Sequence, residues 1–243
     1  MDMLKGEQIA AAALTDWRKL AQGLYARYLV RDYRSAARFV TAIAEAGARI
    51  GHHPRTTIGE GHVDLRLVSV DAVYRDGEGV EHVVEWVTQN DVDLARAITE
   101  IAAGQGIAPE PTAVSEIELG LDTPDSGMIA PVWAALLTGH AESRGRGTPS
   151  DEIRDATGRV PHLWFGDADD ASPQRFHVEV YVPPECVAER VAAVKDAGGV
   201  VIDDSDAPGL TVFADQDGNR GVLCADTSAA SRPAGDAGAV RTA

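Results

Sequence analysis

The sequence predicts an α+β chain with two consecutive units: an antiparallel sheet with helices on one face, then a paired βαββ arrangement. The first half reads as strands, helix, hairpin and helix, whereas the second half repeats a strand–helix–strand rhythm. The segment GQGIAPEPTAV at residues 104–114 concentrates Gly and Pro between the two patterns. We therefore predict one domain at residues 1–105 and another at 115–225, joined by this linker. Residues 226–243 have almost no large apolar side chain and are predicted to form a disordered tail.

The first half begins with a short helix within residues 1–14, followed by two short strands between Thr15 and Val30 with alternating polar and apolar positions. Residues 32–50 place apolar side chains at the spacing of one helical face, and Asp32 or Ser35 is suited to cap the start of that helix. Residues 62–75 and 80–87 flank the turn sequence DGEG and predict a long hairpin. The segment Thr88–Asp91 has the form of a capping box that opens a helix over residues 91–104.

The second half predicts strands at residues 116–122, 159–166 and 175–183, with a helix at 127–139 between the first two. A further helix at 185–199 ends in glycines, and strands follow at 200–204, 209–215 and 219–225. Two such βαββ units are expected to close a curved sheet around a pocket for a small molecule.

Charge and composition exclude several classes of protein. The 243 residues include 38 acidic and 22 basic side chains, a net charge of −16, with 44% hydrophobic content. This balance is typical of a soluble protein and argues against nucleic acid or an anionic membrane as a partner. The N-terminus lacks the features of a signal peptide, and no apolar run approaches the roughly 18 residues of a membrane span. We therefore expect a cytoplasmic protein with two free thiols, Cys186 and Cys224, and the scarcity of lysine favours a GC-rich bacterial source.

The segment His52-His53-Pro54 is the sharpest chemical feature of the sequence. Imidazole has an unperturbed pKa near 6.5, so two adjacent histidines at the end of a helix can give and take protons at neutral pH. A histidine pair in a loop is otherwise a surface feature without a chemical role.

The residues around this pair resemble the pterin-4a-carbinolamine dehydratase family over about the first 105 residues. The matching positions are Trp17, Leu24–Tyr28, Asp32-Tyr33, Ala37–Phe39, Ile43-Ala44, His52–Pro54, Val63–Leu67, Thr88, Asp91 and Leu94-Ala95. The resemblance implies a hydro-lyase that removes water from a 4a-hydroxytetrahydropterin without metal or cofactor. It assigns His52 and His53 as acid and base, and it places Asp91 at the family's acidic position. A capping role is the alternative for Asp91.

One family position is ambiguous. The family carries a third histidine after the strand that follows HHP, and counting forward without gaps puts Val70 there. Counting backward from Asp91 puts His82 there instead, because this chain has about twelve extra residues in the hairpin. His82 would complete a histidine triad, whereas Val70 would leave the acid–base set incomplete.

The second half is similar to the glyoxalase-like branch of the vicinal oxygen chelate superfamily over residues 115–225. The matching segments are 119–122, 132–137, 161–165, 176–180 and 215–219. Candidate metal ligands by this resemblance are Glu116, Glu118, His177 and Glu179, but Val222 stands where metal-dependent relatives carry their terminal glutamate. We therefore expect no metal. Pro54, Trp133, Trp164 and His177 are expected to contact ligands, with core packing the alternative for the two tryptophans and a pocket-wall role the alternative for His177.

Two functions follow from these patterns. The first is a pterin-carbinolamine dehydratase with an appended small-molecule-binding domain. The second is a non-catalytic or repurposed metabolite-binding protein that uses one or both pockets. Exposed edges of antiparallel sheets also favour a homo-oligomer.

Overall fold

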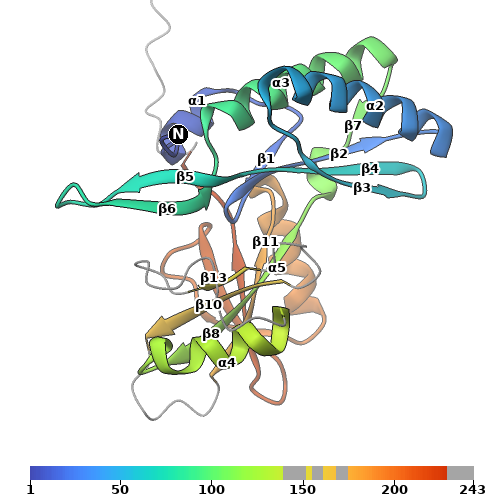
Figure 1. The fold of residues 1–243 in the computed structure, drawn as a ribbon. Helices are drawn as coiled ribbons and strands as arrows, with labels where there is room; N and C mark the ends of the chain where they lie inside the picture. Colours follow the sequence, from blue (N-terminus) through green and yellow to red (C-terminus); the bar gives the residue numbers. More distant parts are fainter. Residues whose placement is uncertain (139–151, 155–160, 168–174, 229–243) are drawn as a thin grey trace, which may run out of the picture.

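The computed structural model describes residues 1–138, 152–154, 161–167 and 175–228, and it confirms the predicted α+β class. Two separate sheets divide the chain. One is built from the first 109 residues with helices on one face, and the other from residues 116 onward (Figure 1). Of the predicted tail, residues 229–243 lie outside the described residues.

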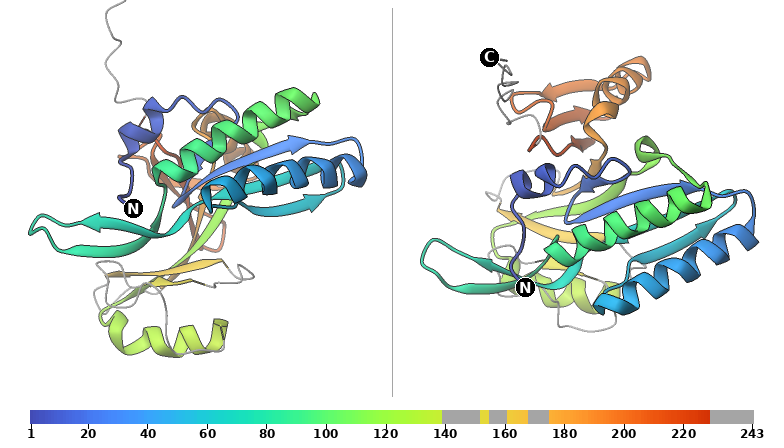
Figure 2. Two further views of the ribbon diagram at one scale, coloured as in Figure 1. Left: turned by 45° about the horizontal axis from the view of Figure 1, so that its top comes forward. Right: turned by 90° about the horizontal axis from the view of Figure 1, so that it is seen from above.

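The first sheet has the order β1-β2-β4-β3. The short strand β7 pairs with Tyr28 and Leu29 at the end of β2, on the edge of β2 that faces away from β4. Its strands are antiparallel and comprise β1 (Arg18–Leu20), β2 (Gly23–Leu29), β3 (Arg55–Gly59), β4 (His62–Leu67) and β7 (Ala108–Pro109). Helices α2 (Tyr33–Ile50) and α3 (Gln89–Gln105) run across one face, beside the short α1 (Gly6–Ala11), as both views of Figure 2 show.

Capping explains where the two long helices begin and end. The Asp32 carboxylate accepts a hydrogen bond from the Ser35 amide at 2.8 Å, and the Thr88–Asp91 capping box opens α3 as predicted. Both helices end at a glycine in the left-handed region, Gly51 and Gly106, each with φ +67°.

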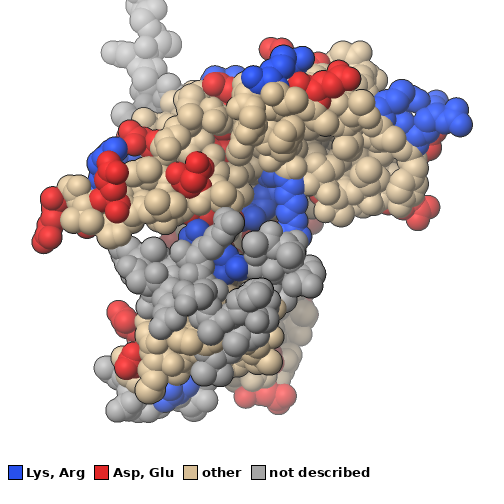
Figure 3. Space-filling model, in the orientation of Figure 1, with Lys and Arg blue, Asp and Glu red and all other residues tan. Residues whose placement is uncertain are grey.

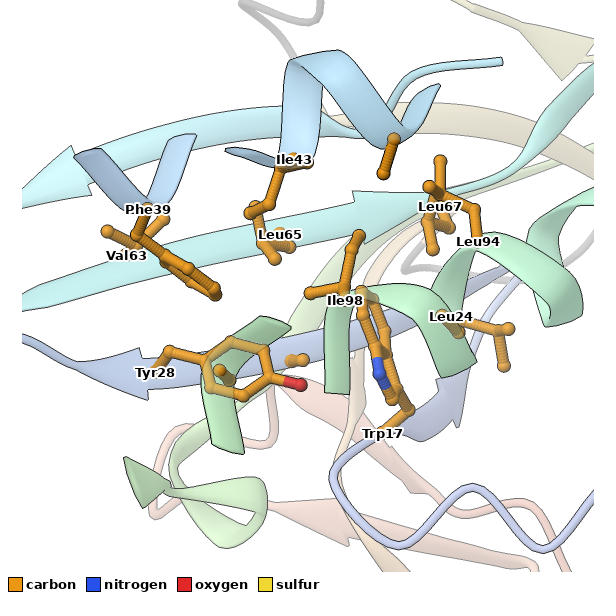
Figure 4. Close-up of a cluster of buried hydrophobic side chains, with 14 of the residues drawn as sticks. Trp17, Leu24, Tyr28, Phe39, Ile43, Val63, Leu65, Leu67, Leu94 and Ile98 are labelled. Atoms are coloured by element: carbon orange, nitrogen blue, oxygen red, sulfur yellow. The ribbon is translucent and has the colours of Figure 1, made fainter. Parts of the chain in front are cut away.

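The core of this domain lies between the sheet and the two helices (Figure 4). Strand β4 alternates strictly, so Val63, Leu65 and Leu67 are buried against the helices. The same alternation places His62, Asp64 and Arg66 on the opposite face of the sheet. That face is turned towards the second half of the chain (Figure 1).

The predicted long hairpin differs from the observed structure. The expected strand 62–75 is interrupted at Val68 and forms two strands, β4 and β5 (Ser69–Arg75). β5 pairs with β6 (Glu81–Trp86) as a two-stranded ribbon that projects from the body (Figure 1), and Val73 of β5 also forms a parallel bridge with Asp2. The chain turns where the Ser69 hydroxyl bonds to residues at the start of α3, and a register shift follows between Ser69 and Ala72. The partner of β4 is instead β3, an edge strand that the sequence analysis did not predict.

The second sheet has seven strands in the order β12-β13-β14-β11-β8-β10-β9. It is mixed, because β10 runs parallel to β8 and β11 runs parallel to β14. Its strands are β8 (Glu116–Thr123), β9 (Glu152–Ile153), β10 (His162–Asp167), β11 (Phe176–Tyr181), β12 (Val200–Asp203), β13 (Leu210–Ala214) and β14 (Arg220–Cys224). Helices α4 (Ser126–Thr138) and α5 (Val187–Asp196) cover it, and the short 3₁₀ turn η2 (Pro184–Cys186) precedes α5.

Several contacts join the two halves. The Arg18 Nε donates to Glu185 Oε1 at 2.7 Å, and Leu20, Tyr25 and Val114 form a small buried cluster against Tyr181. The stretch 104–114 is not a free linker, because β7 pairs with β2 and a 3₁₀ turn, η1 (Pro111–Ala113), follows. Among the described residues, no helix combines the length and apolar character that crossing a membrane would require.

Candidate active site

The His52 ring lies against a buried carboxylate at the point where α2 ends and α3 begins. His52 Nε2 lies 2.6 Å from Asp91 Oδ1, although the two residues are 39 positions apart in the chain. Asp91 has no exposed surface, and the His52 side chain is 16% exposed. A buried carboxylate at this distance fixes the orientation of the imidazole and favours a proton on Nε2, which leaves Nδ1 as the acceptor.

The other oxygen of Asp91 is fully engaged. Asp91 Oδ2 accepts hydrogen bonds from the Thr88 amide at 2.7 Å, from the Ser69 hydroxyl at 2.8 Å and from the Thr88 hydroxyl at 3.1 Å. One oxygen of Asp91 therefore closes the capping box, and the other contacts His52. Sequence reasoning missed Ser69, because a single serine in a strand carries no local signal.

A glycine on α2 sets the position of the two histidines. A Cβ atom added to Gly47 would lie 2.4 Å from the His52 carbonyl oxygen and 2.5 Å from His53 Nδ1. His52 also donates its amide to the Gly47 carbonyl at 3.1 Å as the helix ends. The chain after Gly51 thus folds back onto the last turns of α2, and His53 is exposed beside it.

The structure places His82 away from this pair. His82 Nε2 lies 3.0 Å from Asp76 Oδ2, and its ring stacks on Tyr74, its cross-strand neighbour in the β5–β6 ribbon. The hydrogen bond with His82 is the main cause that holds the pKa of the Asp76 carboxyl below its usual value. In β6, His82 lies four residues before Trp86, the cross-strand partner of Ser69, which corresponds to about 13 Å along the strand. The structure thus joins His52 and Asp91 but does not bring His82 to them.

The forward-counted alternative, Val70, follows Ser69 directly and is 49% exposed. It supplies no titratable group. Pro54 is half-buried, and its carbonyl accepts a hydrogen bond from the Thr56 hydroxyl at 3.4 Å.

The residues of the second half that were expected to contact a ligand belong to two separate pairs of packed aromatic rings. The Trp133 ring packs edge-on against the Phe176 ring, with 5.1 Å between the ring centres. The Trp164 ring packs edge-on against the His177 ring, with 5.3 Å between the ring centres. His177 lies 3.8 Å from carboxylate oxygens of both Asp122 and Glu179, and the interaction with Glu179 is the main cause that raises its pKa.

Carboxylates do gather on one row of the second sheet. Glu118 on β8 lies directly between His162 on β10 and Glu179 on β11, and His162 Nε2 is 2.5 Å from Glu152 Oε2. Val222 is the next residue in that row, opposite Glu179. Within the described residues, no group of three or more His, Cys, Asp or Glu side chains is arranged to hold a metal ion. The sequence analysis did not single out His162 and Glu152, because Glu152 belongs to a two-residue strand without a detectable pattern.

Comparisons with known proteins agree with this division. The family profile described as pterin 4 alpha carbinolamine dehydratase matches residues 2–101, and the profile described as glyoxalase-like domain matches residues 118–224. A protein of Nocardia farcinica, provisionally named pterin-4-alpha-carbinolamine dehydratase, is 31% identical over 103 residues, 42% of this chain and 96% of its own. A protein of Koribacter versatilis with the same provisional name is 31% identical over 94 residues, 39% of this chain and 87% of its own.

Among solved structures, a transcriptional coactivator/pterin dehydratase from Brucella melitensis is similar at 22% identity with a TM-score of 0.33. It covers 42% of this chain and 99% of its own. The chain therefore belongs to the pterin-4a-carbinolamine dehydratase family through its N-terminal half and carries a glyoxalase-like domain in its C-terminal half.

Proposed function

We propose that the N-terminal domain is a metal-independent dehydratase for 4a-hydroxytetrahydropterins. The observation that carries this proposal is the 2.6 Å contact between His52 and the fully buried Asp91, directly before His53. A carboxylate–imidazole pair in a family that dehydrates carbinolamines is the arrangement that such proton transfer needs.

The reaction breaks the bond between C4a and its hydroxyl oxygen and forms a double bond between C4a and N5. His53 donates a proton to the departing hydroxyl, which leaves as water, and His52 takes the proton from N5 through Nδ1. Asp91 is a positioning residue, because it holds His52 in the tautomer with a free Nδ1 and stabilises the imidazolium that forms. Each positioned transfer contributes about 10²–10⁴-fold to the rate.

The glyoxalase-like domain is proposed to bind a small molecule in its curved sheet. Trp133, Trp164 and His177 lie on the helix and strands that would face such a ligand. Two domains, predicted at residues 1–105 and 115–225 with the first lengthened to Pro109 by the pairing of β7, and assembly as a homo-oligomer belong to the same proposal.

A stopped-flow assay of a freshly generated 4a-hydroxytetrahydropterin tests the dehydratase. The full chain should accelerate the loss of water over buffer, and His53→Ala should lower the rate by about 10²-fold or more. His82→Ala is the matched control and should keep the rate, because His82 is held by Asp76 in the ribbon. A fall in rate with His82→Ala, equal to that of His53→Ala, would contradict the two-histidine mechanism.

One observation favours a second candidate function, a pterin-binding protein without turnover. Neither candidate for the family's third histidine adds a proton-transfer group beside His52, since Val70 is apolar and His82 bonds to Asp76. This alternative predicts that the chain binds the pterin stoichiometrically in calorimetry while the rate of water loss stays at that of buffer.

A further inference from the structure

A cleft lies between the open face of the first sheet and the beginning of the second domain. Its volume is about 450 Å³, and its walls include Tyr25, Arg27, Arg55 and Arg66 from the sheet and Ser115 and Glu116 from the opposite side. This volume is within the range of small-molecule sites, about 300–1,000 Å³. Lys and Arg side chains occupy the hollow between the upper and lower units in Figure 3, in a chain whose net charge is −16.

The pleat of the sheet puts these side chains in one row. Arg66 on β4 is the direct cross-strand partner of Tyr25 on β2 and of Arg55 on β3, so all three point to the same face. Because Leu65 and Leu67 are buried against the helices, that face is the one turned to the cleft. Two guanidinium groups directly opposite each other repel, so this row needs negative partners.

The protein's own carboxylates satisfy this row only in part. Arg66 Nη2 donates to Glu85 at 2.6 Å, and in the next row Arg27 forms two 2.7 Å bonds with Asp64. Arg66 Nε is buried, however, and has no hydrogen-bond partner among the described residues, and the buried Tyr25 hydroxyl lies near Glu116 and Arg66 without a well-formed bond to either. Tyr25 is only 7% exposed, and the Arg66 guanidinium carbon lies 5.8 Å from the centre of its ring.

The cleft thus presents the buried Arg66 Nε and the Tyr25 hydroxyl, which lies near Glu116, beside a second cationic side chain, Arg55. Across from them, burial raises the pKa of Glu116, while Arg66 and the Tyr25 hydroxyl oppose that shift, so the carboxyl on this wall ionises less readily than an exposed one. The group that complements such a wall accepts hydrogen bonds and carries negative charge, and guanidinium forks match carboxylate and phosphate oxygens best.

We propose that this interdomain cleft binds a small oxyanion-bearing molecule, a carboxylate or a phosphate, through Arg66 Nε, the Tyr25 hydroxyl and Arg55. Because walls from both domains enclose the ligand, binding also links the two domains. The site is distinct from His52 and Asp91 and does not depend on the dehydratase proposal.

Isothermal titration calorimetry of the full chain at low ionic strength tests the proposal, with inorganic phosphate and succinate as separate probes. At least one probe should bind with one site per chain, and the stronger one identifies the class of oxyanion. Arg55→Gln should weaken that binding by about tenfold or more. Arg34→Gln removes the same charge from the exposed surface of α2, beyond the other face of the sheet, and should leave the affinity unchanged.

Two further variants distinguish binding at the cleft from a general effect of charge or folding. Tyr25→Phe keeps the buried ring and should weaken binding without lowering the thermal midpoint of the free protein. Glu116→Gln removes a competing negative charge and should tighten binding. The proposal is overturned if neither probe binds, if Arg34→Gln weakens binding as much as Arg55→Gln, or if Glu116→Gln lowers the affinity.

Discussion

Replacing Asp91 by asparagine should disable the candidate site by reversing the tautomer of His52. The carboxylate now accepts four hydrogen bonds, three on Oδ2 from Thr88 and Ser69 and one on Oδ1 from His52. An asparagine has one acceptor oxygen, which the Thr88 amide and the Ser69 hydroxyl would occupy. Its NH₂ group would then face His52 Nε2, so His52 would carry its proton on Nδ1 and lose the acceptor that the mechanism uses.

The magnitude follows from these contacts. A hydrogen bond to a buried charged group contributes about 1.5–3 kcal/mol, and the amide retains part of the network, so we expect a loss of about 1–3 kcal/mol in the free energy of unfolding. For a domain of about 100 residues this corresponds to a fall of about 4–20 °C in the thermal midpoint. Wrong-tautomer substitutions of this type lower the rate by up to about 10⁴-fold, so we expect a decrease of about 10²–10⁴-fold in dehydration.

Stopped-flow dehydration below the melting range gives the rate, and ¹⁵N NMR of the His52 ring gives the tautomer. Ser69→Ala is the matched control, because it removes one bond to Asp91 Oδ2 and leaves the contact with His52. It should lower stability but retain the Nε2-protonated tautomer and most of the rate. A folded Asp91→Asn variant with the wild-type tautomer and a rate within about threefold of wild type would refute the positioning role.

Three further predictions concern close packing, a buried hydroxyl and a buried lysine. Gly47→Ala should lower the free energy of unfolding in urea by about 1–3 kcal/mol, because its Cβ would lie 2.4 Å from the His52 carbonyl oxygen. Gly104→Ala has open space around its Cβ and should raise the free energy of unfolding by about 0.5–1 kcal/mol. Equal effects of the two substitutions would contradict the close approach at Gly47. Tyr25→Phe should leave the free energy of unfolding unchanged or raise it, because the Tyr25 hydroxyl makes no well-formed hydrogen bond. Tyr28→Phe should lower the free energy of unfolding by about 1 kcal/mol, because the Tyr28 hydroxyl donates a hydrogen bond to Asp16 at 3.0 Å. A larger loss of stability with Tyr25→Phe than with Tyr28→Phe would show that the Tyr25 hydroxyl is satisfied. Burial is the main cause that lowers the pKa of Lys19 from 10.5 to about 8. Between about pH 8 and pH 10.5 the unfolded chain therefore binds more protons at Lys19 than the folded chain does. The free energy of unfolding should accordingly rise with pH from about 8 to about 10.5. Lys19→Met should flatten that rise and stabilise the protein at pH 7, as measured by urea unfolding at pH 7 and pH 9.5; an unchanged pH profile would exclude Lys19 as its source.

The sequence predicted those helices and turns whose signals lie within a few neighbouring residues. Asp32 and the Thr88–Asp91 box marked the beginnings of α2 and α3, because a cap needs only a few neighbouring residues. The turn sequence DGEG likewise marked the turn between β5 and β6. Strand β3 was missed because it is an edge strand with mostly exposed side chains, so it lacks the apolar alternation that reveals a strand.

Tertiary packing determined what the sequence left open. The contact of His52 with Asp91 depends on where α3 begins relative to the end of α2, and the ambiguity between Val70 and His82 depends on how the extra hairpin residues fold. The ribbon places them away from the sheet, where Asp76 holds His82. The arginine-lined cleft was not foreseen, since it forms only when the second domain covers the open face of the first sheet.

The most direct test is a single-turnover measurement of 4a-hydroxytetrahydropterin dehydration with the full chain in excess. Wild-type protein and the double variant His52→Gln/His53→Gln would be compared with buffer. The two-histidine account predicts a clear acceleration by the wild type and a rate close to that of buffer for the double variant. A wild-type rate equal to that of buffer, or a double variant as fast as wild type, would contradict it.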